Sequence, residues 1–166
     1  TVSFVDGASS VVLDSTYDEY MFVCTDIGPA TDEAYFTFNG SSDSGSNYNV
    51  TKTTTSFRAY HSEGGSGALG YDAANDHAQG TGFQYLTEYQ ANEADASAAG
   101  ILHIFSPANT TYVTHFYSRF HYMQASDYAI QMFAAGYFNV TAALDAFQFK
   151  MSAGAFDGVI QLYGIA

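Results

Sequence analysis

The chain has very few positively charged residues. Its only cations are Lys52, Arg58, Arg119 and Lys150, against 17 acidic residues, and the formal net charge is −13. Proteins hold a nucleic-acid backbone with clusters of Lys and Arg, which four scattered cations do not form. The negative field also disfavours anionic membrane surfaces. We therefore expect no nucleic-acid partner. We attribute the acidity to a solvated surface, with a specific cation site as the alternative.

Cysteine and long apolar runs are also scarce. Cys24 is the only cysteine, which excludes an intrachain disulfide. We expect Cys24 to be a small buried hydrophobe, because its acidic neighbours Glu19 and Asp26 do not favour a reactive thiolate. No run of about 18 apolar residues occurs, so we expect no membrane insertion. The chain starts at Thr1 without an initiator Met or a signal-peptide pattern, and we expect either processing or an absent upstream part.

Aromatic side chains are abundant instead. The 166 residues include 14 Tyr and 14 Phe but no Trp, and hydrophobic residues make up 47%. A chain of this length suits one domain and buries roughly 70% of its unfolded surface. We therefore expect residues 1–166 to form a single globular domain.

Short runs of strand character follow one another along the chain, separated by turn residues. These runs are Val2–Val5, Tyr20–Ile27, Ala34–Asn39, Asn49–His61, Gly100–Phe105, Tyr112–Met123 and Ile130–Phe138. The segments Asn39–Asn47 and Ser62–Gly82 read as surface loops, and Ser106–Asn109 reads as a hairpin turn. The segment Phe83–Ala99 starts like a strand and ends in an Ala-rich stretch that fits a loop or a helical turn. The pattern predicts an all-β protein, an antiparallel β-sandwich of jelly-roll type.

The C-terminal segment Leu144–Ala166 adds two alternating arms around a Ser-Ala-Gly turn. In the first arm Phe147, Phe149 and Met151 alternate with polar residues, which is the two-residue period of a half-buried strand. The second arm alternates likewise. We expect the two arms to pair with each other as a closing β-hairpin.

Two groups of residues have the chemistry of a metal site. Asp72 and Asp76 supply two carboxylates within a Gly-rich loop, at a spacing unlike that of an EF-hand, so a polar turn-forming loop is the simpler interpretation. A hairpin about Pro107–Thr110 places His103 across from Thr114 or His115, and paired histidines can bind a transition metal. A half-buried histidine with one hydrogen bond is the commoner outcome among aromatic neighbours.

Catalytic patterns are weaker still. The stretch Gly64–Gly70 lacks the Lys of a phosphate-binding loop and reads as a flexible turn. No Gly-x-Ser-x-Gly elbow occurs between a strand and a helix. We assign no catalytic, cofactor-binding or metal-binding residue, and we expect neither an enzyme nor a bound cofactor.

The C-terminal segment Phe147–Ile165 resembles the closing segment of tail-fibre-like or structural virion proteins from phages that infect aquatic bacteria. The resemblance continues upstream and covers most of the chain. It includes Asp14–Val23, Asp26–Asp32, Ser56–His61, Ala78–Thr81 and Gly136–Ala143. Because these are strand and turn patterns, the resemblance implies a module on the virion surface and transfers no functional residue.

Two functions follow as expectations. The first is a non-catalytic phage structural protein on the virion surface, in a tail fibre, head fibre or capsid decoration. Such a module self-assembles as a homo-oligomer, expected to be a trimer in a fibre, and contacts other virion proteins. The alternative is a glycan-binding, lectin-like module of a phage adhesin or a secreted bacterial protein, with tyrosines of Tyr112–Tyr122 stacking on host sugars. Exposed aromatics on one sheet face favour the lectin, and aromatics buried between subunits favour the assembly protein.

Overall fold

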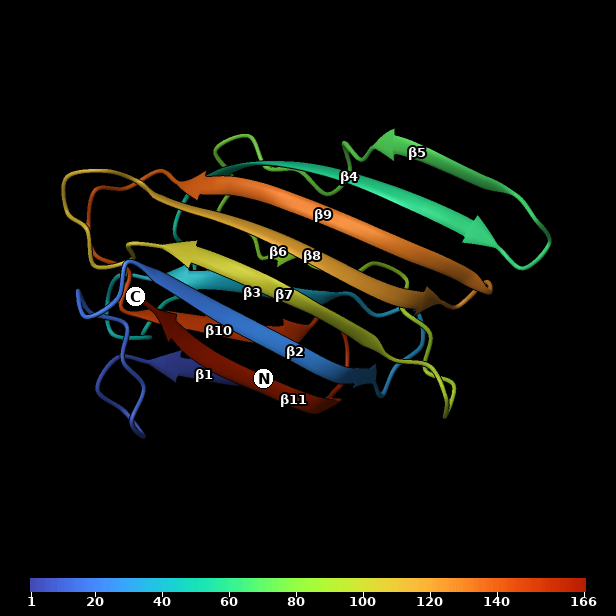
Figure 1. The fold of residues 1–166 in the computed structure, drawn as a ribbon, viewed down its shortest axis with the longest axis horizontal. Coiled ribbons are helices and arrows are strands. Elements are labelled where there is room, and N and C mark those ends of the chain that lie inside the picture. The colour runs from blue at the N-terminus through green and yellow to red at the C-terminus, as the bar shows by residue number, and fades with distance from the viewer.

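The computed structural model describes residues 1–166 as two antiparallel β-sheets that pack as a sandwich (Figure 1). The expected all-β sandwich is therefore confirmed. No helix able to cross a membrane is present. The strands are β1 (Val2–Val5), β2 (Glu19–Pro29), β3 (Phe36–Ser41), β4 (Lys52–Ser62), β5 (Gly67–Tyr71), β6 (Gln84–Tyr85), β7 (Ala98–Phe105), β8 (Thr114–Gln124), β9 (Tyr128–Phe138), β10 (Ala146–Met151) and β11 (Phe156–Ile165).

The two sheets differ in size and share the chain unevenly. One has four strands in the order β1-β10-β3-β6, and the other has seven in the order β11-β2-β7-β8-β9-β4-β5. Every pair of neighbours is antiparallel. The predicted hairpin about Ser106–Asn109 is confirmed, because β7 pairs with β8 on either side of it. The central strand of the larger sheet is β8.

Phenylalanine rings from both sheets fill the core. Phe149 of β10 lies 5.0 Å from Phe22 of β2, and Phe38 of β3 lies 5.0 Å from Phe116 of β8, measured between ring centroids. These rings meet tilted or edge to face, the geometries that aromatic pairs prefer. They belong to one cluster of 23 buried residues. The first of the two C-terminal arms, β10, therefore contributes to the contact between the layers, together with β2, β3 and β8.

The expected C-terminal hairpin is wrong. β10 pairs with β1 and β3 in the smaller sheet, whereas β11 pairs with β2 in the larger one. The turn at Ser152–Ala155 crosses from one sheet to the other. Packed sheets lie about 10 Å apart, and four extended residues span that distance. A two-residue period identifies each strand but not its neighbour, so the sequence pattern fits a crossover as well as a hairpin.

One strand was missed in the segment after β4. β5 lies inside the predicted loop Ser62–Gly82, where glycines lower the strand propensity. It forms because it lies in register with β4, with Tyr71 beside Phe57 and Leu69 beside Ala59. β6 confirms the strand-like start of Phe83–Ala99, and the Ala-rich end of that segment is a loop with a turn.

Candidate functional site

The histidine pair considered from the sequence does not form. The register of β7 and β8 places His103 opposite Tyr117, and His115 opposite Phe105. His103 stacks on Tyr117 with ring centroids 4.5 Å apart, and its Nδ1 contacts the carboxylate of Glu19. No group of three His, Cys, Asp or Glu side chains is placed to hold a metal ion. The loop between the two strands is longer than the assumed turn, and this difference moves the register.

Asp72 and Asp76 do not converge on a common ion either. Asp72 is buried, and its Oδ2 lies 3.6 Å from Nε of Arg58. Asp76 instead accepts a hydrogen bond of 2.5 Å from the hydroxyl of Tyr71. The two carboxylates therefore serve different partners.

Cys24 is buried in the core, as expected. Its side chain is 1% exposed, and burial raises the pKa of the thiol to about 12. A thiol held in this protonated form is a poor nucleophile.

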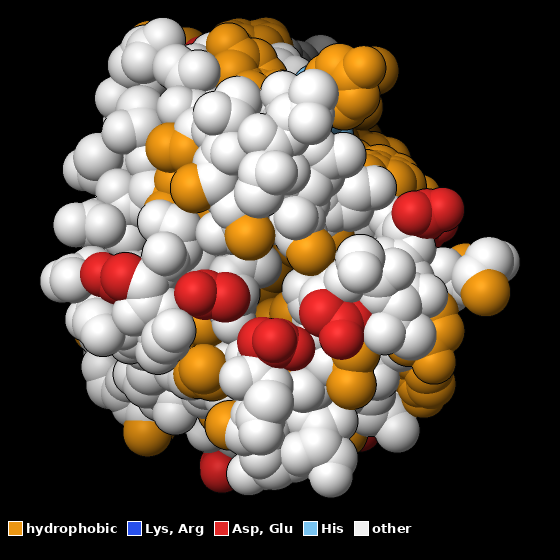
Figure 2. All heavy atoms as spheres, turned by 90° about the vertical axis from the view of Figure 1, so that its left-hand side faces the viewer, with side chains coloured by type: hydrophobic (Ala, Val, Ile, Leu, Met, Phe, Trp, Pro, Cys, Tyr) orange, Lys and Arg blue, Asp and Glu red, His pale blue; other side chains and the backbone are white.

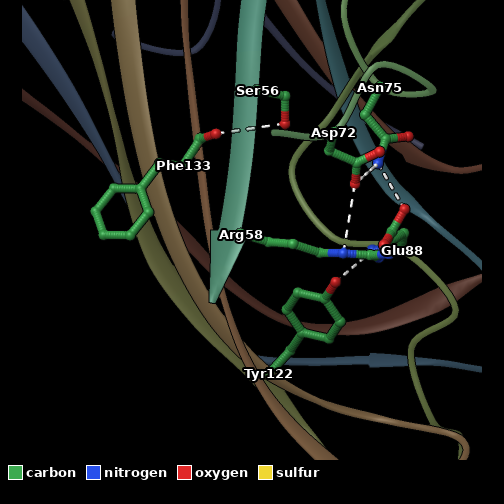
Figure 3. A network of polar contacts seen from close by, with 7 residues as sticks. All are labelled: Ser56, Arg58, Asp72, Asn75, Glu88, Tyr122 and Phe133. Carbon is green, nitrogen blue, oxygen red and sulfur yellow. Dashed lines mark hydrogen bonds and ion pairs between the residues drawn. The ribbon is translucent and has the colours of Figure 1, made fainter. Parts of the chain in front are cut away.

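A buried polar network lies between β4, β8 and the segment 72–91 (Figure 3). The guanidinium of Arg58 contacts the carboxylates of Glu88 and Asp72. Asn75 Nδ2 bridges the same two acids, at 2.8 Å from Asp72 Oδ2 and 2.5 Å from Glu88 Oε2. The Tyr122 hydroxyl accepts a hydrogen bond of 3.1 Å from the backbone N–H of Glu88. The network anchors a segment that has little regular structure.

The polar residues of β4 could have predicted this network from the sequence. The positions of β4 that point into the molecule are polar, where a sandwich strand usually presents apolar residues. They include Lys52, Thr54, Ser56 and Arg58. Such a strand needs polar partners inside the protein, and the segment 72–91 provides them.

An open pocket of about 310 Å³ lies beside this segment, on the four-stranded sheet. β3, β6 and β10 contribute Thr37, Tyr85 and Lys150, and the loop between β5 and β6 forms the opposite wall. The wall residues are Ala74, Asn75, Asp76, His77, Gly82 and Phe83, and Ser152 closes the rim. The pocket therefore combines two aromatic rings, a lysine, a carboxylate and an amide.

The second feature is the outer face of the seven-stranded sheet, the face turned away from the four-stranded sheet. Along β8 the exposed residues alternate with buried ones, and the registers place outward residues of β7 and β9 beside them. The outward residues of these three strands are His115, Tyr117, Arg119, His121, Ala99, Ile101, His103, Phe105, Gln131, Phe133, Ala135 and Tyr137. Arg119 is the only fully charged residue among them.

The apolar character of the outer face extends to its edges. Six of the ten exposed large hydrophobic residues of the protein lie on it, and they come from β4, β5, β8 and β11. They are Phe57, Leu69, Tyr71, Tyr117, Val159 and Tyr163. Phe57 and Phe133 lie flat against each other with ring centroids 4.7 Å apart. Polar side chains, among them His115, Arg119, His121 and Gln131, lie between these apolar residues on the middle strands. Exposed apolar patches commonly mark interaction surfaces.

Other parts of the surface carry the negative charge. Figure 2 shows the end of the sandwich that lies on the left in Figure 1, where several acidic side chains spread over the loops and no Lys or Arg is visible. This end includes loops with Asp6, Asp43 and Asp145. The tyrosines considered for glycan stacking divide between environments. Tyr112 is 73% exposed and Tyr117 is 41% exposed, whereas Tyr122 is fully buried.

Comparison with known proteins does not place this chain in a family. No family model, no curated protein and no solved structure matches the chain. The functional argument therefore depends on the outer face and on the pocket.

Proposed function

We propose that this chain is a non-catalytic structural protein of a phage virion surface, and that it acts by self-assembly through the outer face of the seven-stranded sheet. The fibre or decoration role comes from the sequence resemblance. The observation that supports self-assembly is the outer face, where exposed Phe57 and Tyr117 and the neighbouring Phe133 lie on strands whose middle carries one full charge, in a protein whose net charge is −13. Exposed aromatics on one sheet face also fit the glycan-binding alternative, which the variants below distinguish from an interface between subunits.

The dimensions of the outer face suit a stable interface. With strands about 4.8 Å apart and about 3.3 Å per residue, seven strands present roughly 900 Å². A standard protein interface covers about 800 Å² on each partner. Tyr117, Phe57 and Phe133 lie on this face, and aromatic residues of this kind are enriched at the centres of interfaces.

The distribution of charge over the surface is compatible with a second copy as the partner. Two molecules that each carry a net charge of −13 repel each other where their acidic loops meet. Over β7, β8 and β9 the only full charge on the outer face is Arg119, so the middles of two such faces can meet without opposing carboxylates. A face that can pair with a second copy of itself supports a two-fold dimer more directly than the trimer expected for a fibre.

We also propose that the sandwich is an elaborated jelly roll. Two features support this topology. The chain crosses repeatedly between the sheets from β1 to β4, and the early strand β1 lies beside the late strand β10. A jelly roll has eight strands in two sheets, so three of the eleven strands here are additions. In this interpretation the additions are one hairpin within β7–β9 and the edge strand β11.

Self-assembly can be tested by light scattering and sedimentation of the purified protein. We expect the wild type to form a dimer and Tyr117→Asp to be monomeric, because the new carboxylate lies in the centre of the interface. Tyr112→Asp is the matched control, since Tyr112 is 73% exposed and lies in a loop outside the outer face. It should leave the dimer intact.

Two results would contradict the proposal. One is a wild-type protein that remains monomeric at about 1 mM, where even a weak specific contact is populated. The other is an oligomer that Tyr117→Asp does not affect.

A further inference from the structure

The pocket on the four-stranded sheet is a second candidate binding site. It lies on the sheet opposite the outer face, so self-assembly through the outer face leaves it open. Its volume of about 310 Å³ is at the lower end for small-molecule sites. A ligand of one ring suits this size better than a nucleotide or an extended peptide.

The loop that forms the pocket wall is held in place from several directions. His77 exchanges two hydrogen bonds of 2.9 Å with Thr54, and Gly80 exchanges two of 2.9 and 3.0 Å with the backbone of Lys52. Asn39 Nδ2 donates to the carbonyl of Thr81 at 3.0 Å. A Gly-rich stretch of chain is thereby fixed, and a fixed wall lowers the entropy cost of binding.

The buried ion network supports the same wall. Burying the carboxylates of Glu88 and Asp72 beside the partly exposed Arg58 gives little net stability, because desolvation offsets the attraction. The network does hold the side chain of Asn75, whose Nδ2 is committed to both acids. Figure 3 shows the Asn75 carbonyl oxygen pointing away from those acids, and this oxygen has no hydrogen-bond partner within the chain. The network thus fixes Asn75, a residue of the pocket wall, and leaves one acceptor of its side chain free.

The remaining pocket groups offer complementary hydrogen bonding. Lys150 forms no ion pair, and its Nζ lies 3.9 Å from the centroid of the Phe83 ring. Asp76 uses Oδ2 for the Tyr71 hydroxyl and keeps Oδ1 free of partners within the chain. Phe83 and Tyr85 are half-buried and expose part of their rings. The pocket therefore holds a donor, two acceptors and apolar ring surface.

We propose that this pocket binds a single neutral hexopyranose unit. A pyranose has hydroxyls that both donate and accept hydrogen bonds, and it has an apolar face of C–H groups that can lie on an aromatic ring. Lys150 would donate to its hydroxyls, and Asp76 and Asn75 would accept from them. A phosphate or sulfate fits less well, because Lys150 is the only cation of the pocket and Asp76 opposes it.

The test is an amide chemical-shift titration of the full chain with D-glucose, D-galactose, D-mannose and N-acetyl-D-glucosamine in turn. We expect one or more of these sugars to change the amide chemical shifts of residues 74–83 and 150–152. The expected Kd is about 1 mM, which is typical of a weak single-site contact. Lys150→Gln and Asp76→Asn should each raise this Kd at least ten-fold. Arg119→Gln is the matched control, because it removes an exposed cation without an ion pair from the opposite sheet and should leave the Kd unchanged.

Three outcomes would overturn the proposal. The first is that none of the four sugars shifts these amides at about 10 mM, well above the expected Kd. The second is binding that Lys150→Gln and Asp76→Asn do not weaken. The third is an equal loss in Arg119→Gln, which would place the sugar elsewhere. None of these readouts depends on the oligomeric state, so this test and the self-assembly test can fail separately.

Discussion

At the scale of single residues, Lys52 is the most unusual side chain of the protein. It is completely buried, and its Nζ donates to Asn39 Oδ1 at 2.9 Å without a carboxylate partner. Burial lowers the pKa of Lys52 to about 8. The contact joins β4 of one sheet to β3 of the other, so an amine that resists protonation lies between the two layers.

This lowered pKa predicts a pH-dependent stability difference between the wild type and Lys52→Met. Below about pH 8 Lys52 is charged in both states, and the folded protein carries the full desolvation cost. Between pH 8 and 10.5 the unfolded chain binds a proton that the folded chain has lost, so the free energy of unfolding of the wild type rises with pH. The gain is about 3 kcal/mol at 1.36 kcal/mol per pKa unit.

Urea denaturation at several pH values checks this prediction. Lys52→Met lacks the titrating group, so its stability relative to the wild type should be highest near pH 7 and should decline toward pH 10.5. Tyrosines titrate in both proteins and cancel in the difference. A difference that is constant over this range would show that Lys52 is not desolvated in the folded state.

Cys24 gives a second residue-scale prediction. Because burial raises the pKa of its thiol to about 12, we expect no reaction with a disulfide reagent at pH 8 in the native protein. In denaturant one thiol per chain should react. Rapid labelling of the native protein would contradict the buried position of Cys24.

At the scale of elements, the pairing of β11 with β2 depends on a bulge at Gly158. Gly158 has a φ of +129°, and a Cβ there would lie 2.7 Å from the carbonyl oxygen of Asp26. We expect Gly158→Ala to lower the free energy of unfolding by about 1–3 kcal/mol, because both the backbone and the contact become strained. Gly70→Ala is the control, since nothing lies within 4 Å of its Cβ position. Equal effects in chemical denaturation would argue against the bulge.

The segment 72–91 gives the other element-scale prediction. Arg58→Met leaves Glu88 and Asp72 buried without their cation, and should destabilise the protein by about 3 kcal/mol. Part of this loss should return when Glu88→Gln is added, because the second change removes an unpaired charge. A double-mutant cycle in urea measures the coupling, and additive effects would contradict the ion pair.

Hydrogen exchange extends the same prediction to the pocket. If the network holds the pocket wall, the amides of residues 74–83 should exchange faster in Arg58→Met than in the wild type. Amides of β8 and β9 serve as the internal reference. Uniformly faster exchange would indicate global destabilisation instead of a loosened wall.

At the scale of the whole molecule, net charge opposes self-assembly and the outer face favours it. Raising the salt concentration from about 10 mM to about 100 mM shortens the screening length from roughly 30 Å to roughly 10 Å. We therefore expect the dimer to become several-fold tighter with added salt, measured by sedimentation. A dimer that weakens with salt would instead indicate contacts between opposite charges, such as Arg119 of one copy and Glu19 of the other.

The sequence by itself determined the fold class and most of the strands. Alternating apolar residues located β8 and β9, and the same period located β10 and β11, because a half-buried strand must place every second side chain in the core. The isolated, acidic setting of Cys24 likewise predicted a small buried thiol. These properties depend on local patterns, which a single sequence displays directly.

Tertiary structure decided which strands are neighbours and which polar residues meet. The period of β10 and β11 cannot tell a hairpin from a crossover, and the register of β7 and β8 depends on the length of the loop between them. The pocket, the Arg58 network and the outer face each combine residues far apart in the chain. Their existence follows from how the strands are ordered within the two sheets, which no local pattern specifies.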